Sequence, residues 1–337
     1  MKKKSGGRSA LIVLCVVLGL ILVIMACATV YADHLLGLMN RVEKGQEETL
    51  SQEELDELLG EGGSGPDDSD LGWDDAELVK TSDNIVNILL IGQDAREGWG
   101  RSRSDSMILL TINKEKKTIT MTSFLRDLYV KIPGYKDNKM NAAYPAGGME
   151  LLNKTLEVNF GVQVDGNVEV DFSHFADVIE LLGGVEIELR DDEANYINRK
   201  LGNQGIASSL TGGKQLLNGD QALWYSRIRY LDADSDFSRT NRQRKVINSL
   251  IDKFRDAKLT TLLGLLDDLM PMITTDMSNG EILGYATDLF PMLADCKVIS
   301  QRVPADGEYT LDTIRGMSVV LADMEAARQL IRDTLAD

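Results

Sequence analysis

The stretch NIVNILLIGQD, residues 84–94, decides the fold class of this chain. It is a nearly continuous apolar run of strand length that ends in the polar triplet Gly92-Gln93-Asp94, and such a run is typical of a buried strand. Two further runs follow, SMILLTIN at residues 106–113 and TITMTSFL at residues 118–125, joined by the turn KEKK. The three runs predict a meander whose last two strands form a hairpin.

Helical and strand-like patterns alternate after this meander. The expected helices are residues 149–160 closed by Gly161, residues 173–182 closed by a glycine pair, and residues 324–335; the expected strands are residues 164–172, 185–189 and 297–304. The alternation predicts an α/β fold, with a central mixed sheet flanked by helices in one domain over residues 84–337. His174 falls in the first turn of the second helix, where capping or packing is expected rather than catalysis.

The N-terminal part of the chain predicts a membrane anchor. Residues 10–32 contain 23 residues without a charge, and about 20 such residues span a bilayer as a helix. Four cations precede this run and Asp33 follows it, so the positive-inside rule places residues 1–9 in the cytoplasm and the rest outside. The alternative is a cleaved signal peptide, since Ala26-Cys27-Ala28 resembles a cleavage site, but the apolar regions of such peptides are shorter.

Composition narrows the classes of function. Lys and Arg total 36 against 53 Asp and Glu, a net charge of −17, which argues against a nucleic-acid partner. Much of this acidity lies in residues 33–83, which we expect to be a stalk or linker because they offer too few apolar residues for a core. Two histidines leave little material for a Ser-His-Asp triad, and three cysteines cannot form a disulfide framework.

Polar residues gather where the strands of the predicted meander end. Neighbouring strands lie about 4.8 Å apart, so these residues share a small patch at one sheet edge. A single charge there is explained by a solvated salt bridge, whereas several arginines between separated aspartates have the chemistry of a divalent cation beside a phosphate clamp. The patch contains Asp94, Arg96, Arg101, Arg103, Asp105, Arg126 and Asp127.

A second arginine-rich group lies in residues 212–244. Asn218 is a good N-cap for the helix NGDQALWYS. Arg227 and Arg229 face alike only if the backbone extends after Ser226, so a paired clamp predicts a helix end there. Arg239 and Arg242 suit one face of a following helix that continues through residues 245–254, and a basic surface helix is the alternative.

With these residues in hand, the chain resembles the LytR-CpsA-Psr family of envelope phosphotransferases. The resemblance rests on motifs in the family's order over residues 84–255: NILLIGQDAREG, RSRSDSMILLTIN, SFLRDLYVKIPG, KMNAAYPAGGME, ELLGGVEIEL, LNGDQALWYSRIRY and the run from Asp234 to Gln243. Two motifs depart from the common pattern, since Asp94-Ala95-Arg96 stands for D-S-R and Leu125-Arg126-Asp127 for P-R-D. Neither change removes a charged group.

The resemblance implies a fold that holds a polyprenyl chain in an apolar pocket with its pyrophosphate at the mouth. It also implies transfer of a glycan phosphate, of teichoic acid or polysaccharide type, from polyprenyl pyrophosphate to peptidoglycan at the outer face of a Gram-positive-type membrane. Carried over by position, Asp94 and Asp105 match the ligands of Mg²⁺ or Mn²⁺. The expected pyrophosphate ligands are Arg96, Arg101 or Arg103, Arg126, Lys139, Arg227, Arg229, Arg239, Arg242 and Gln243.

Phosphoryl transfer needs positioning and charge stabilisation more than a protein nucleophile. We therefore expect Arg126, Asp127, Arg227 and Arg229 to carry the catalysis, with Asp127 or Asp236 as candidates for deprotonating the acceptor. Two other functions stay open at this point. One is a membrane-anchored receptor or regulator that binds wall polymer without turnover, and the other is a hydrolase that releases the lipid pyrophosphate to water.

The charge asymmetry around residues 10–32 gives a first testable prediction. We expect residues 33–337 to be outside the cell and attached to the membrane. Protease added to intact protoplasts should digest the domain, and complete protection of the domain would contradict this topology.

Overall fold

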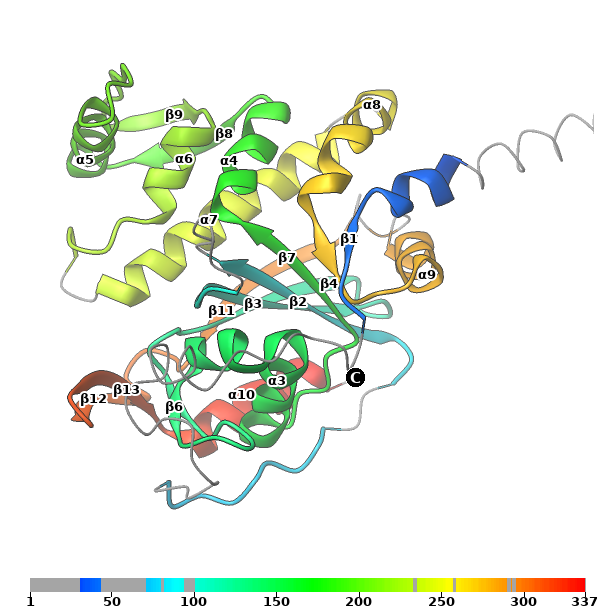
Figure 1. The fold of residues 1–337 in the computed structure, drawn as a ribbon, viewed down its shortest axis with the longest axis vertical. Helices are drawn as coiled ribbons and strands as arrows, with labels where there is room; N and C mark the ends of the chain where they lie inside the picture. The colour runs from blue at the N-terminus through cyan, green and yellow to red at the C-terminus, as the bar shows by residue number, and fades with distance from the viewer. Residues whose placement is uncertain are drawn as a thin grey trace, which may run out of the picture.

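A seven-stranded mixed sheet forms the centre of the computed structural model, which describes residues 31–43, 71–79, 82–93, 101–232, 235–256, 259–289, 292 and 295–336 (Figure 1). The strand order is β1-β10-β7-β2-β3-β4-β11. The strands are β1 (Asn40–Arg41), β10 (Thr274–Thr275), β7 (Gly166–Asp171), β2 (Ile85–Gln93), β3 (Ser104–Asn113), β4 (Thr118–Phe124) and β11 (Lys297–Val303).

The predicted meander is confirmed. β2 pairs antiparallel with β3, and β3 pairs antiparallel with β4. β2 lies between β3 and its parallel neighbour β7. Its side chains pack into a core on each face of the sheet, Leu89 on one face and Ile88 on the other, which explains its nearly continuous apolar sequence. β11 adds to β4 in parallel and completes the mixed sheet.

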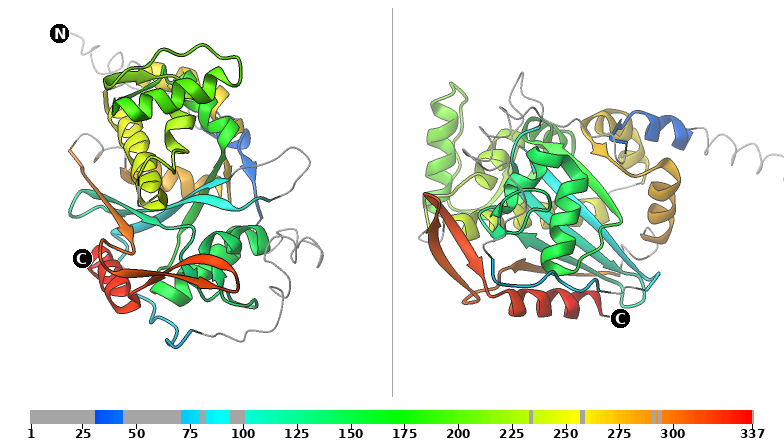
Figure 2. Two further views of the ribbon diagram at one scale, coloured as in Figure 1. Left: turned by 90° about the vertical axis from the view of Figure 1, so that its left-hand side faces the viewer. Right: turned by 60° about the horizontal axis from the view of Figure 1, so that its bottom comes forward.

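Helices cover both faces of this sheet, as the α/β prediction requires. α3 (Ala143–Phe160) and α10 (Met324–Leu335) pack on one face, where Leu89 and Leu109 of the sheet meet Leu152 and Ile331. α4 (Phe172–Leu181), α7 (Ser235–Asp256), α8 (Leu259–Leu269) and α9 (Asn279–Leu289) lie on the other side. The views in Figure 2 keep α10, drawn in red, on the side of the sheet away from these four helices.

A smaller unit with its own core packs against α7. It contains the hairpin of β8 (Val185–Leu189) and β9 (Gly213–Leu217) with α5 (Asp191–Gly202) and α6 (Gly219–Ser226). Ile187, Ile197, Tyr225 and Val246 are buried together in it. The strand predicted at residues 185–189 therefore exists, but it pairs outside the central sheet.

Two short sheets and two 3-10 turns complete the described fold. The elements are β5 (Tyr129–Val130), β6 (Asn138–Lys139), β12 (Tyr309–Ile314), β13 (Met317–Ala322), η1 (Met140–Ala142) and η2 (Met270–Met272).

Parts of the predicted stalk pack on the domain, so residues 33–83 are not a spacer throughout. The backbone N–H groups of Asn40 and Val42 donate to the carbonyls of Ile273 and Thr275, which makes β1 the edge strand of the sheet. Trp73 and Val79 pack against the main core. Backbone hydrogen bonds let a segment with few apolar residues dock on the sheet. The hydropathy pattern of the sequence does not reveal such bonds, so it did not predict this contact.

The predicted membrane anchor at residues 10–32 falls almost wholly outside the described residues. Residues 31–37 are helical. Among the described residues, no helix has both the length and the apolar character needed to cross a membrane.

The helix end predicted at Gly161 is confirmed, and the start of α4 is capped as well. α3 ends at Gly161, whose φ is 72°, in the left-handed region that glycine adopts without strain. α4 begins with Asp171 accepting the N–H of His174, and His174 Nδ1 lies 3.0 Å from an Asp171 oxygen. His174 is thus part of a helix start, which agrees with the predicted capping role.

Gly161 gives a stability prediction. A Cβ at this position would lie 2.2 Å from the carbonyl oxygen of Glu77, because the segment 71–79 runs against the end of α3. Gly205 has a similar φ of 76° with nothing within 4 Å of its Cβ position. Gly205→Ala should cost about 1–2 kcal/mol for the left-handed backbone, and Gly161→Ala at least about 1 kcal/mol more for the steric overlap.

Urea unfolding of both variants measures this difference. Equal unfolding free energies for Gly161→Ala and Gly205→Ala would contradict the docking of residues 71–79 on α3.

Candidate functional site

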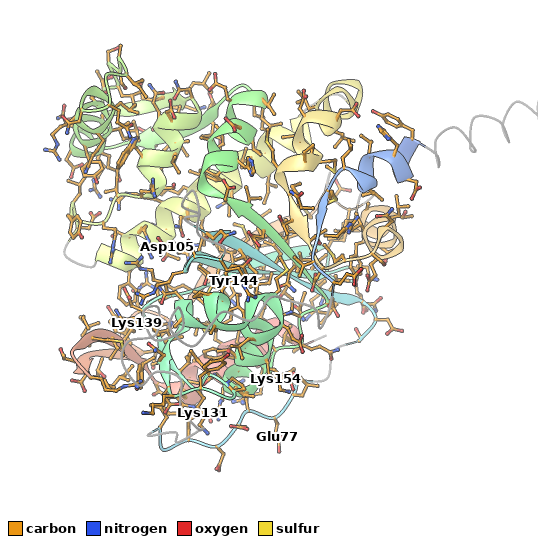
Figure 3. The ribbon with its side chains drawn as sticks, viewed as in Figure 1. Glu77, Asp105, Lys131, Lys139, Tyr144 and Lys154 are labelled. Atoms are coloured by element: carbon orange, nitrogen blue, oxygen red, sulfur yellow. The ribbon has the colours of Figure 1, made fainter. Side chains whose placement is uncertain are left out.

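The ends of β2, β3 and β4 meet at one sheet edge, as predicted. Gln93, the last residue of β2, pairs with Ser104, the first residue of β3. Arg126 follows the end of β4, and its Nη1 lies 2.5 Å from Asp105 Oδ1. The structure therefore brings Asp105 and Arg126 together from different strands, and Figure 3 labels Asp105 at this edge.

Asp127 is the anion around which several cations gather. Lys139 Nζ donates to Asp127 Oδ1 at 2.8 Å, Arg126 Nε lies 3.6 Å from Oδ2, and Arg229 Nη2 lies 3.9 Å from Oδ2. Burial by itself would raise the pKa of Asp127, but the hydrogen bond from Lys139 and the charges of Arg126, Lys139 and Arg239 hold that pKa below its usual range. Asp127 is therefore ionised at neutral pH, and a carboxylate so stabilised is a weak base.

A small polar cavity of about 90 Å³ opens at this edge. Its lining has four guanidinium groups and one carboxylate, and arginine forks bind phosphate oxygens two at a time. The lining residues are Asp105, Arg126, Ser226, Arg227, Arg229, Arg239 and Gln243.

Local structure explains how residues distant in sequence reach this cavity. α6 starts with a capping box between Asn218 and Gln221 and ends at Ser226, so Arg227 and Arg229 leave the helix and both line the cavity. The helix end predicted from a paired clamp is confirmed. Arg239 and Gln243 come from α7 at a spacing of four residues, which puts them on one helical face.

An apolar cavity of about 330 Å³ adjoins the polar one. It lies between the sheet and the helices α4 and α7, with a lining that includes Leu90, Ile108, Val170, Val178 and Ile247. Ser226 and Gln243 line both cavities. An elongated apolar chain in the larger cavity would therefore present a charged head group to the arginines.

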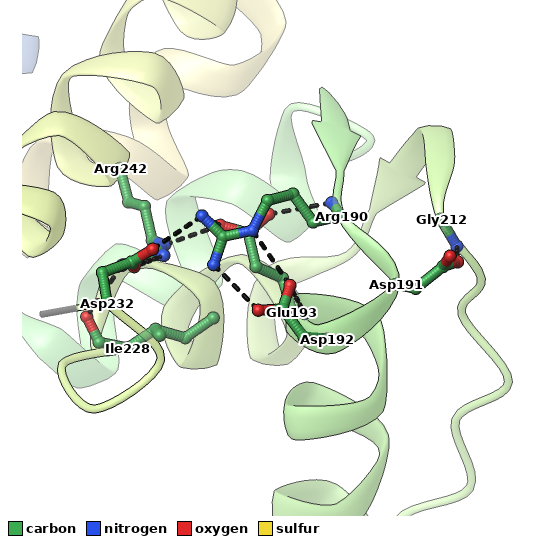
Figure 4. A network of polar contacts seen from close by, with 8 residues as sticks. All are labelled: Arg190, Asp191, Asp192, Glu193, Gly212, Ile228, Asp232 and Arg242. Atoms are coloured by element: carbon green, nitrogen blue, oxygen red, sulfur yellow. Dashed lines mark hydrogen bonds and ion pairs between the residues drawn. The ribbon is translucent and has the colours of Figure 1, made fainter.

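Arg242 corrects one sequence-based assignment. Predicted as a phosphate ligand, it is buried and donates instead to Glu193 at 2.8 Å, to Asp232 and to the carbonyl of Ile228 (Figure 4). Arg190 bridges to the same Asp232 at 2.8 Å. The guanidinium of Arg242 holds α7 to α5 and the loop after α6, and does not line the described cavities.

The remaining predicted site residues lie at different distances from the polar cavity or outside the described part of the chain. Lys139 reaches the site through Asp127 and is labelled in Figure 3. Arg101 is half-buried and Arg103 exposed, just before β3; neither lines the polar cavity. Asp94, Arg96 and the side chain of Asp236 lie outside the described part of the chain.

The metal prediction rests on a carboxylate pair of which the structure describes one member. Among the described residues, no group of three or more His, Cys, Asp or Glu gathers as a metal site. Asp105 lines the arginine-rich cavity and offers carboxylate oxygens, the ligand type that Mg²⁺ and Mn²⁺ prefer.

Sequence reasoning missed a buried polar network behind this edge. Glu169 of β7 accepts hydrogen bonds from Gln93 and from the hydroxyl of Tyr144. Gln93 in turn accepts the N–H of Ser102 at 3.1 Å, which fixes the backbone between Arg101 and Arg103. The sequence does contain one sign of this network, because Glu169 lies within the strand at residues 166–171 between two valines.

An α/β domain with an arginine-lined polar cavity continuous with an apolar one defines a class of protein that binds an anionic amphiphile. A sequence profile of the LytR_cpsA_psr family matches residues 60–333. The chain belongs to the LytR-CpsA-Psr family.

Known relatives show the range of this family. The chain is 35% identical over 217 residues to the polyisoprenyl-teichoic acid–peptidoglycan teichoic acid transferase TagT of Bacillus subtilis, covering 63% of this chain and 65% of TagT, slightly less than two thirds of its length. It is 33% identical to the regulatory protein MsrR of Staphylococcus aureus, covering 75% of each chain. A solved structure of TagT with bound octaprenyl pyrophosphate lipid matches with a TM-score of 0.60 and 26% identity, covering 79% of this chain and 98% of that one.

The buried pairing of Arg242 predicts a structural role. Arg242→Met removes the nearest cation from the buried Glu193, which keeps only the Arg190 backbone N–H at 3.0 Å and the Arg190 guanidinium at 3.9 Å. Breaking a buried ion pair costs about 3–5 kcal/mol. Arg229→Gln, at a partly exposed position, should change the unfolding free energy by less than about 1 kcal/mol. Chemical denaturation compares the two, and full stability of Arg242→Met would return Arg242 to the list of candidate ligands.

Proposed function

We propose that this protein transfers a glycan phosphate from a polyprenyl pyrophosphate carrier to peptidoglycan at the outer face of the cell membrane. The observation that carries the proposal is the junction of the two cavities at Ser226 and Gln243. The junction suits an amphiphile whose apolar chain ends in phosphates. The name of TagT and the octaprenyl pyrophosphate bound in its solved structure support the same chemistry.

The reaction needs one bond to form and one to break. A hydroxyl of the acceptor sugar attacks the phosphorus next to the glycan, the bond from that phosphorus to the bridging oxygen breaks, and polyprenyl phosphate leaves. The acceptor loses its hydroxyl proton in this step, and the leaving polyprenyl phosphate or solvent water takes that proton up. Negative charge shifts toward the leaving phosphate, and the arginines that line the polar cavity stabilise it there.

Asp127 orders these arginines in the proposed reaction. Because its carboxylate contacts Lys139 and lies near Arg126 and Arg229, it limits their mutual repulsion. Its lowered pKa favours this role over that of the base that takes the acceptor proton.

We further propose that Asp94 and Asp105 hold Mg²⁺ or Mn²⁺. Oxygen ligands suit these ions rather than Zn²⁺, and Asp105 already lies in the polar cavity. The ion would neutralise phosphate charge when bound. The location of this chemistry follows the proposed topology, with the anchor at residues 10–32 and the domain outside.

The function can be tested by single-turnover transfer from lipid-linked donor to peptidoglycan. Replacing Arg227 or Arg229 by Lys keeps the charge but loses the planar fork. Because the clamp tightens as charge shifts to the leaving phosphate, each variant should lose transfer by at least about tenfold, roughly 1.4 kcal/mol of transition-state stabilisation, with a smaller effect on donor binding. EDTA should abolish transfer, and Mg²⁺ should restore it.

The product identifies the correct function among the alternatives. Glycan phosphate on peptidoglycan supports transfer, whereas free glycan phosphate with released lipid indicates a hydrolase. Donor binding without turnover indicates a receptor or regulator, a role that the name of MsrR keeps open. Folded Arg→Lys variants with full activity would remove both arginines from the site.

A further inference from the structure

The hairpin of β12 and β13 contacts the charged cluster through the backbone of Asp127. The backbone N–H of Val320 in β13 donates to the carbonyl of Asp127 at 2.9 Å, and Leu128 forms an isolated β-bridge with the same valine. Figure 1 shows this hairpin beside β6. The hairpin therefore packs on the segment that carries the carboxylate around which the cations gather.

The turn of this hairpin holds an arginine where the backbone favours a smaller residue. Ile314 pairs with Met317, so Arg315 and Gly316 form a two-residue loop, and their φ values are 49° and 74°. Positive φ at both positions is typical of a type I′ turn, whose first position favours Asn, Asp or Gly. An arginine there carries backbone strain that a glycine would avoid, which points to a role for its side chain.

The guanidinium of Arg315 bridges the two strands of the β5–β6 sheet. Its Nη2 donates to the hydroxyl of Tyr129 in β5 at 2.9 Å and to the carbonyl of Asp137, the residue before β6. Its Cζ lies 5.9 Å from the centre of the Tyr129 ring. Because only 1% of Tyr129 is exposed, Arg315 contacts β5 through a side chain that has little freedom to move.

The same two strands carry the ion pair between Lys139 and Asp127. Tyr129 lies directly opposite Lys139 in the pairing of β5 with β6. The pairing continues beyond β6, because the backbone N–H of Met140 donates to the carbonyl of Leu128 at 2.7 Å. A shift of β6 along β5 would therefore move Lys139 Nζ away from Asp127 Oδ1, which it contacts at 2.8 Å.

We propose that Arg315 is a positioning residue for the transfer reaction, because it holds β6 in register with β5 and so keeps Lys139 on Asp127. The inference rests on the proposed function, in which Asp127 orders the cavity arginines. With Lys139 in place, the same carboxylate lies 3.6 Å from Arg126 and 3.9 Å from Arg229. Arg315 itself lines neither of the two cavities, so it acts on the reaction only through these residues.

Steady-state transfer by the full chain in detergent micelles tests the proposal with Arg315→Asn. Asparagine tolerates the left-handed backbone, so this variant keeps the turn and loses the guanidinium. We expect kcat to fall roughly three- to tenfold, because small displacements of positioned groups slow a reaction strongly. The KM for the lipid-linked donor should change by less than about twofold, since both cavities keep their linings. Tyr129→Phe removes one of the two acceptors and should lower kcat less, in the same direction.

Two control variants separate this role from a general loss of stability or charge. Lys117→Asn removes a cation from the same kind of backbone, since Lys117 has a φ of 51° in the turn between β3 and β4. Gly316→Ala strains the Arg315 turn but leaves the guanidinium in place, because nothing lies within 4 Å of the Cβ position of Gly316. Both variants should keep kcat within about twofold of the wild-type value.

A double-mutant cycle tests whether Arg315 acts through Lys139. Lys139→Met removes the amine, and adding Arg315→Asn to this variant should lower kcat no further, because a positioning residue has no effect once the group that it positions is gone. Independent losses that multiply in the double variant would overturn the proposal, as would an unchanged kcat in Arg315→Asn or an equal fall in either control variant.

Chemical labelling of Lys139 reports its position without any reaction. An amine-acylating reagent, followed by mass spectrometry, should modify Lys139 roughly threefold faster in Arg315→Asn than in the wild type, since a partly exposed ion pair protects the amine modestly. Lys114, which pairs with Asp288 at 2.9 Å, is the internal reference. Unchanged labelling of Lys139 would overturn the proposal. Faster labelling in a protein that transfers nothing supports the hold of Arg315 on the ion pair and contradicts the proposed function alone.

Discussion

Repulsion between like charges is the constraint on which this structure depends. Five cations, Arg126, Lys139, Arg227, Arg229 and Arg239, are brought close to one sheet edge. Coulomb energies between charges a few ångströms apart are large wherever water is partly excluded. Asp105 and Asp127 supply the compensating charge, and Asp127 does so in contact with Lys139 and near Arg126 and Arg229. Among the residues that the structure describes at this edge, two carboxylates face five cations, an excess of positive charge that suits an anion.

The fold supplies this edge by bringing together chain segments of different kinds. The meander carries Asp105 on β3 and Arg126 just after the neighbouring strand β4, and the smaller unit contributes Arg227 and Arg229 just after α6. The apolar cavity lies between the same sheet and the helices α4 and α7, and it shares Ser226 and Gln243 with the arginine-lined cavity. The charged and apolar parts of the site are therefore one structural feature.

Much of this could be predicted from sequence because it depends on local patterns. The apolar runs at residues 85–91 and 106–113 give the strands, Gly161 gives a helix end, and Ser226 gives the turn that aligns Arg227 with Arg229. Contacts between distant segments could not be predicted in this way. The pairing of Asn40 with β10 uses backbone groups that every residue has, and the Glu169 network joins residues of β2, α3 and β7.

Helical periodicity alone does not tell which residue of α7 shares the cavity face with Arg239, as Arg242 shows. Spacings of three and four residues both keep side chains on one side of a helix, so Arg239 with Arg242 and Arg239 with Gln243 are equally acceptable pairs in the sequence. The structure chooses the second pair, because Arg242 is buried against Glu193 and Asp232.

That buried contact sets the rotation of α7 about its axis. The face of α7 that lies toward the cavities carries Arg239, Gln243, Ile247 and Ile251. Along this face the side chains change from charged to polar to apolar. This change follows the order of groups in a lipid pyrophosphate, from phosphate to hydrocarbon. A residue that touches neither cavity therefore determines which side chains of α7 reach both.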